Sequence, residues 1–137
     1  MQMQRKKNGY TLIELMIVVA VIGSLSALAV YNYNRYGFRG RRAEGRELAM
    51  RIAAAEERYF TNFNAYTDDF TKLKLTGGDK SDNGFYLATI NVPTGNLTFT
   101  VTATPQAGQA KDKCLNLTVN NTGFKGYSGD VSNGACW

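Results

Sequence analysis

Apolar and polar residues are distributed unevenly along the chain. Residues 1–9 are mostly polar and basic, and no residue from Leu15 to Val30 carries a charge. The stretch from Tyr10 to Val30 has 21 residues, and about 20 predominantly apolar residues cross the hydrocarbon core of a bilayer as a helix. The pattern therefore predicts a membrane-spanning helix in residues 10–33.

Residues 34–60 keep the helical period but become amphipathic. Four apolar residues spaced by four, three and four positions form one stripe: Leu48, Ile52, Ala55 and Tyr59. Charged residues off this stripe are expected to face water or other subunits: Glu47, Arg51, Glu56 and Arg58. A helix from Tyr10 to Phe60 would be about 75 Å long. This is too long for a compact head of this size, so the apolar half is expected to project.

The period changes to two in the last part of the chain. After a predicted loop at 61–84, alternating patterns indicate strands at 85–90, 97–103 and 115–119, with a weaker one at 124–127. An antiparallel sheet of three or four strands with one apolar face needs a cover, and the helical stripe supplies it. We therefore predict an α+β fold with a globular head at 61–137. Four glycines inside the helix favour bending or local melting of the helix: Gly23, Gly37, Gly40 and Gly45.

Charge and composition narrow the possible functions. The formal net charge is +5, but Arg5, Lys6 and Lys7 supply three of the positive charges, and residues 61–137 carry six Lys and six Asp. A head of zero net charge gives no support to nucleic acid as a partner. The chain has no histidine, which excludes Ser-His-Asp and Cys-His catalysis and zinc sites that use His.

The two cysteines, Cys114 and Cys136, are 22 positions apart. An even number of cysteines outside a C-x-x-C motif, behind a membrane-directed N-terminus, predicts a disulfide in an oxidising compartment. The alternative is two free, buried thiols in a cytosolic protein.

Two features separate the N-terminal segment from an ordinary signal peptide. A signal peptide has its small residues after the apolar run, whereas here Gly9 precedes the run. The run also contains Glu14, and a carboxylate within a spanning helix costs roughly 2.5–3.5 kcal/mol and is usually paired. No basic residue lies between Tyr10 and Asn34.

The residues from Gly9 to Gly23, GYTLIELMIVVAVIG, resemble the class III leader and helix of type IV pilins. The resemblance implies that residues 1–9 are a leader cleaved after Gly9 by a prepilin peptidase. It also implies that Tyr10, where the family usually has Phe, becomes N-methylated. Glu14 would then partner the α-amino group of a neighbouring subunit.

Later segments resemble type IVa minor pilins, in particular the PilE-like group. These segments are AEERYFTNFNAYT, DKCLNLTVNNTG and the closing CW. The resemblance implies a non-enzymatic subunit of a helical filament that supports pilus assembly, twitching motility and adhesion, with no cofactor or metal. It implies a single-pass inner-membrane protein before assembly, and then a periplasmic and cell-surface pilus. The alternatives are a type II secretion pseudopilin, which the cysteine pair disfavours, and a DNA-uptake receptor pilin.

Three further patterns allow a functional and a plain interpretation. Five arginines surround Glu44: Arg35, Arg39, Arg41, Arg42 and Arg46. We interpret them as intersubunit ion pairs and solvated side chains rather than as a nucleic-acid or anionic-lipid patch. The residues from Asp79 to Gly84 match the opening of a calcium loop, but Ile90 occupies the position of the bidentate Glu, which favours a turn. Neighbouring Glu56 and Glu57 point in different directions on a helix and do not form an acid–base pair.

Overall fold

The structure, a computed structural model, describes residues 9–137, and for residues 31 and 34 only the backbone. The predicted leader therefore lies outside the described residues except for Gly9. The chain divides into two compact units, one ending at Arg35 and one running from Tyr36 to Trp137. The second unit is called the head below.

The secondary structure is one long helix followed by a small sheet. Helix α1 spans Leu12–Phe63 and the one-turn helix α2 spans Phe70–Leu73. The strands are β1 (Tyr86–Asn91), β2 (Thr100–Pro105), β3 (Leu117–Asn120) and β4 (Lys125–Tyr127), with a 3-10 turn, η1, at Ala107–Lys111 between β2 and β3. All four strands pair antiparallel in the order β1-β2-β3-β4.

The predicted elements are present, with shifted ends. The four strands lie within or next to the expected segments, and α2 forms inside the predicted loop. Helix α1 is continuous through all four of its glycines, so the helix does not melt locally at any of them. It ends where Asn64 adopts a left-handed conformation, φ 52°, which is a common way for a helix to stop.

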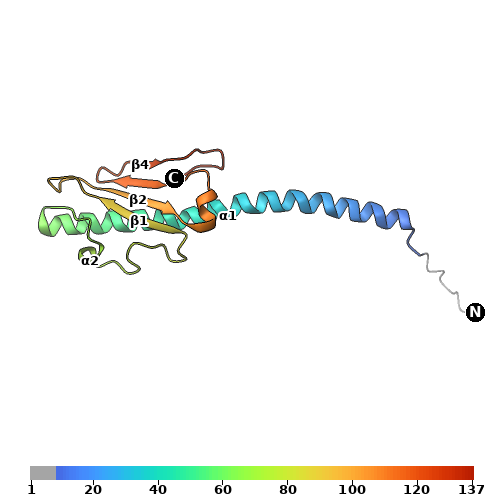
Figure 1. Cartoon of the computed structure of the whole chain (residues 1–137), viewed down its shortest axis with the longest axis horizontal. Coiled ribbons are helices and arrows are strands. Elements are labelled where there is room, and N and C mark those ends of the chain that lie inside the picture. The colour runs from blue at the N-terminus through green and yellow to red at the C-terminus, as the bar shows by residue number, and fades with distance from the viewer. Residues whose placement is uncertain (1–8) are drawn as a thin grey trace, which may run out of the picture. The chain divides into compact units, whose positions relative to one another are not determined.

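The core of the head lies between α1 and the sheet. Figure 1 shows the sheet running alongside the C-terminal half of α1. The predicted stripe is confirmed for Leu48, Ile52 and Ala55, all of which are buried, and Tyr59 packs against the same cluster. Strand β2 alternates buried and half-buried residues, because successive side chains of a strand point to opposite faces. Its buried face meets the helix.

One helical glycine explains the close contact between the helix and the sheet. A Cβ at Gly45 would lie 2.9 Å from the ring of Tyr86, a residue of β1 that is fully buried. The missing side chain lets the aromatic ring rest on the helix backbone. Gly45 is unfavourable for the helix itself, but it allows the helix and the sheet to pack closely.

One prediction about the helix surface is wrong. Glu56 was expected to face water or another subunit, but it is 0% exposed. Its Oε2 atom accepts a hydrogen bond from the backbone N–H of Thr67, at 3.1 Å. The carboxylate connects the loop after α1 to the helix. The pattern of apolar residues in the helix did not predict this contact.

Candidate functional site

The N-terminal unit exposes a continuous apolar surface. Its large apolar side chains between Leu12 and Val30 are each at least half exposed. Helix α1 is long and apolar enough in this part to cross a membrane. Such a surface needs lipid or protein around it, because burying apolar area is the main favourable term in association. This is the part of the chain in which the sequence placed its processing and assembly residues.

The candidate cleavage residues lie just before α1. Gly9 and Tyr10 are exposed and non-helical, with Tyr10 at 89% exposure, while α1 begins at Leu12. An exposed, non-helical peptide suits a protease, because a helix would hold the scissile bond within its own hydrogen bonds. The roles of Gly9 and Tyr10 remain predictions.

Glu14 has a partner in its own chain. The backbone N–H of Thr11 donates to Glu14 Oε2 at 3.4 Å, and the backbone N–H of Glu14 donates to Thr11 Oγ1 at 3.3 Å. These reciprocal bonds form a capping box, in which two otherwise unpaired helix N–H groups are satisfied. The pattern Thr-x-x-Glu before an apolar run is the sequence signature of a capping box, so this pair could have been predicted. The carboxylate thus caps the helix, and it remains exposed on the outer surface of the first turn.

In the head, three arginines hold the C-terminal segment. Arg39, Arg42 and Arg46 occupy positions i, i+3 and i+7 of α1 and therefore share one face; we call them the arginine stripe. Their guanidinium groups donate to backbone carbonyls of residues 133–136, at distances of 3.0–3.4 Å. The arginine stripe therefore fixes the C-terminal segment to α1.

Arg42 is the central member of the stripe and is completely buried. Its Nε and Nη2 atoms donate to the two carboxylate oxygens of Asp112, at 2.6 and 2.5 Å, and both side chains are 0% exposed. The hydrogen bond to Asp112 raises the pKa of Arg42 above its usual value. Gln109 completes the network by donating to Asp112 Oδ2 and to the hydroxyl oxygen of Tyr86.

This geometry corrects the interpretation of the basic cluster. Arg42 is neither solvated nor available to another subunit, and Arg39 and Arg46 are used in the head. Arg41 lies over the ring of Phe85, 4.6 Å from its centroid. The spacing of three and four residues within the cluster could have revealed a buried stripe. The acid that pairs with it, 70 positions away, could not be read from the pattern.

The predicted disulfide is formed. Cys114 and Cys136 are bonded, with a Cα–Cα distance of 5.5 Å, and both residues are buried. The bond links the C-terminal segment, which the arginine stripe also binds, to Cys114. The C-terminal indole adds a third contact, because Trp137 Nε1 donates to the carbonyl of Gly126 in β4 at 2.6 Å.

In the segment that resembles a calcium loop, side chains make hydrogen bonds within the protein. Ser81 Oγ accepts a hydrogen bond from the backbone N–H of Tyr86. Asn83 donates from its backbone and from its side chain to the carboxylate of Glu44, at 3.2 and 2.7 Å. Within residues 9–137 no group of three or more acidic or thiol side chains is arranged to hold a metal ion. The segment is therefore a turn that is hydrogen-bonded to α1 within the head.

Acidic side chains also lie in and just after the last turns of α1. Burial is the main cause that raises the pKa of Glu56 to about 7. The hydrogen bond from Thr67 opposes the rise, and the neighbouring charges of Glu57 and Asp68 add to it. Glu57 accepts a hydrogen bond from the hydroxyl of Tyr66 at 3.1 Å. These contacts fix the loop and provide no acid–base pair positioned for a substrate.

Comparison with known proteins covers both parts of the chain. A family model described as a prokaryotic N-terminal methylation motif matches residues 4–30. A second, described as "Type IV minor pilin ComP, DNA uptake sequence receptor", matches residues 32–118. Together they extend over most of the sequence.

Individual relatives agree with these matches. The type IV major pilin protein PilE1 of Neisseria gonorrhoeae is 30% identical over 115 residues, which are 84% of this chain and 70% of that protein. The fimbrial protein EcpC of Eikenella corrodens is 29% identical over 128 residues, which are 89% of this chain and 82% of that protein.

Solved structures show the same fold. A type IV pilin from Shewanella oneidensis superimposes with a TM-score of 0.54 at 21% identity, covering 73% of this chain and 97% of that one. The non-core minor pilin PilV of Neisseria meningitidis gives 0.55 at 25% identity, covering 74% and 94%.

Proposed function

The chain belongs to the type IV pilin family, and from this premise we propose that it is a minor pilin that helps to assemble a type IV pilus. The observation that carries the proposal is the contrast between the two units. The head has its own buried core, its own disulfide and a fixed C-terminus, whereas the helix from Leu12 to Val30 exposes apolar side chains throughout. A helix of this kind is stable in a bilayer or among identical helices. Neither state requires catalysis, and the chain is a structural subunit.

The steps before assembly follow from the N-terminal residues. A prepilin peptidase cuts after Gly9 and Tyr10 is N-methylated, while α1 anchors the subunit in the inner membrane. The subunit then leaves the membrane for the periplasm and the cell-surface pilus, where it contacts other pilin subunits and supports twitching motility and adhesion. Glu14 accepts the α-amino group of a neighbouring Tyr10. The exposed position of its carboxylate supports this role.

Processing and assembly can be tested together. Mass spectrometry of the mature protein should give N-methylated Tyr10 as the first residue, and the protein should be present in sheared pili. Deletion should impair twitching and leave protein secretion intact, whereas the opposite result would support a type II secretion pseudopilus. An intact Met1 in the mature protein, or a cut after Val30, would contradict the proposal.

A DNA-uptake receptor is the second candidate, because the family model that matches residues 32–118 carries that description. The zero net charge of residues 61–137 argued against nucleic acid, but net charge averages over a surface and does not report a local cluster of cations. A gel shift of the purified protein on duplex DNA at increasing salt concentrations tests this candidate. Binding that is absent even at low salt would remove it.

A further inference from the structure

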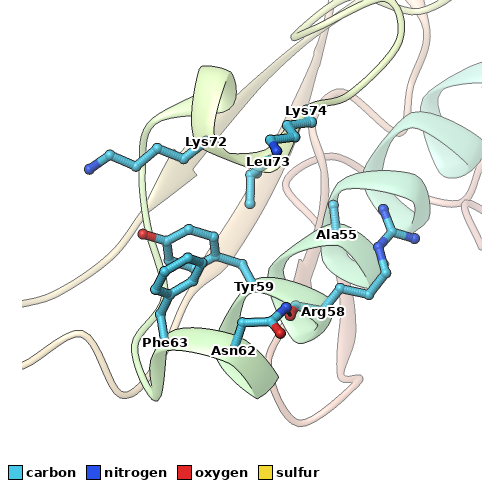
Figure 2. Close-up of a pocket in the computed structure, with 8 residues that line it drawn as sticks. All are labelled: Ala55, Arg58, Tyr59, Asn62, Phe63, Lys72, Leu73 and Lys74. Atoms are coloured by element: carbon cyan, nitrogen blue, oxygen red, sulfur yellow. Dashed lines mark hydrogen bonds between the residues drawn. The ribbon is translucent and has the colours of Figure 1, made fainter.

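A cavity lies between the last turns of α1 and the one-turn helix α2. Its volume is about 170 Å³. Figure 2 shows Tyr59 and Phe63 stacked beneath Leu73, with Lys72 on one side and Arg58 on the other. All of its lining residues belong to the head. No feature described above uses this cavity.

The floor of the cavity is aromatic. The rings of Tyr59 and Phe63 are 4.5 Å apart between centroids and tilted by 30°. Phe63 is 64% exposed although it is the last residue of α1. Phe63 is not part of the hydrophobic core of the head. Its ring therefore exposes apolar surface that the fold does not bury. A flat apolar partner would cover it.

The walls of the cavity are cationic. Arg58, Lys72 and Lys74 line it, and no carboxylate does. Within residues 9–137 the three side chains make no hydrogen bond or ion pair to protein groups. Lys72 is near Asp69, whose pKa is lowered chiefly by its bonds to Thr71 and only to a smaller extent by Lys72. The cations are therefore available to an anion.

The backbone at one wall has a left-handed conformation. Lys74 is the C-cap of α2 and has a φ of 50°, a conformation in which glycine or asparagine is favoured. A lysine at this position carries some backbone strain. Lys74 adds a second ammonium group beside that of Lys72, and with Arg58 it makes three cations at the cavity.

We propose that this cavity binds an unpaired nucleotide of single-stranded DNA, with its base stacked on Phe63 and its phosphates held by Arg58, Lys72 and Lys74. Aromatic side chains beside a cationic path are the means by which proteins hold single strands. A free phosphate would have no use for the aromatic floor, and a neutral ring would have no use for the cations. A base inside a duplex cannot present its face, because its neighbours cover it. The proposal rests on the DNA-binding candidate function and specifies the form of DNA that the head selects.

The test uses the processed full-length protein in detergent and a labelled thymidine oligonucleotide, single-stranded or annealed to its complement, followed by fluorescence polarisation. We expect tighter binding to the single strand. Phe63→Ala should weaken single-strand binding by about 5- to 100-fold, the range for the loss of one stacked base, and Phe63→Trp should restore it. Replacing Arg58, Lys72 and Lys74 by Gln should reduce the slope of log affinity against log salt by about 2.

Matched controls separate this site from general basicity. Lys111→Gln with Lys113→Gln removes two exposed lysines elsewhere on the head and should leave the single-strand preference unchanged. All variants should reach wild-type levels in sheared pili. An unaffected Phe63→Ala variant would overturn the proposal, as would equal loss in the control pair or equal competition by polyglutamate. If duplex binding persists without single-strand preference, this inference fails and the receptor candidate survives. If neither DNA binds, both fail.

Discussion

The buried pair of Arg42 and Asp112 makes a sharp prediction about the stability of the head. In Arg42→Met the apolar part of the side chain is kept and the charge is lost. Asp112 is 1% exposed, so its carboxylate would be left in the core without its cation. Breaking a buried pair in this way costs about 3–5 kcal/mol, which is roughly a fifth or more of the total of about 5–15 kcal/mol for a typical domain.

The matched control is Arg46→Met on the same face of the helix. Arg46 donates to the carbonyls of Cys136 and Ala135 but has no buried carboxylate as a partner. Its loss should cost about 1 kcal/mol, the usual net value of a hydrogen bond. The double variant Arg42→Met/Asp112→Leu removes both charges. It should recover at least about 2 kcal/mol of the loss, since two apolar residues often replace a buried pair without net cost.

The assay is denaturation by guanidinium followed by fluorescence and by far-ultraviolet circular dichroism. Trp137 is the only tryptophan in the sequence and lies in the segment next to the one that Arg42 binds, so fluorescence reports the C-terminus and dichroism reports the helix. Coincident curves would show one cooperative unit. The reasoning is refuted if Arg42→Met costs no more than Arg46→Met, or if the double variant is as unstable as the single one.

Three further predictions concern Glu56, the disulfide and Glu14. The pKa of Glu56 is about 7 in the folded head against an ordinary 4.5, so the folded state binds more protons between these values. The free energy of unfolding should therefore fall as pH rises from about 4.5 to about 7, by up to about 3 kcal/mol, and Glu56→Gln should flatten this dependence in denaturation measured across pH. Cys136→Ser should lower the free energy of unfolding by about 3 kcal/mol on the chain-entropy estimate. The arginine stripe should keep the native Trp137 fluorescence of this variant unchanged. Two reactive thiols in the wild-type protein taken from the periplasm would contradict the bond itself. Glu14→Gln keeps a side chain that can complete the capping box but removes the charge, so its membrane level should be normal and its level in sheared pili low, as for Glu14→Ala. Wild-type incorporation of either variant would show that the charge is not needed.

The sequence by itself determined the long helix, its apolar N-terminal part and the strands. Each of these features is visible over a short stretch of sequence. The first is the uncharged run from Leu15 to Val30. The others are the helical stripe of Leu48, Ile52 and Ala55 and the alternating pattern of the strands, which follow from periods that chain geometry imposes. The capping box of Thr11 and Glu14 is equally local and could have been predicted from its spacing. The disulfide was predictable because only two cysteines exist to pair.

Only the tertiary structure decided how the charges are used. The arginine cluster looked solvated because a helix pattern shows which residues share a face but not what that face meets. Asp112 reaches Arg42 from 70 positions away, and Glu56 is buried because the loop at Thr67 folds back over it. The cavity at Phe63 forms because α2 returns to the end of α1. Such contacts depend on the path of the connecting loops, and no period in the sequence encodes that path.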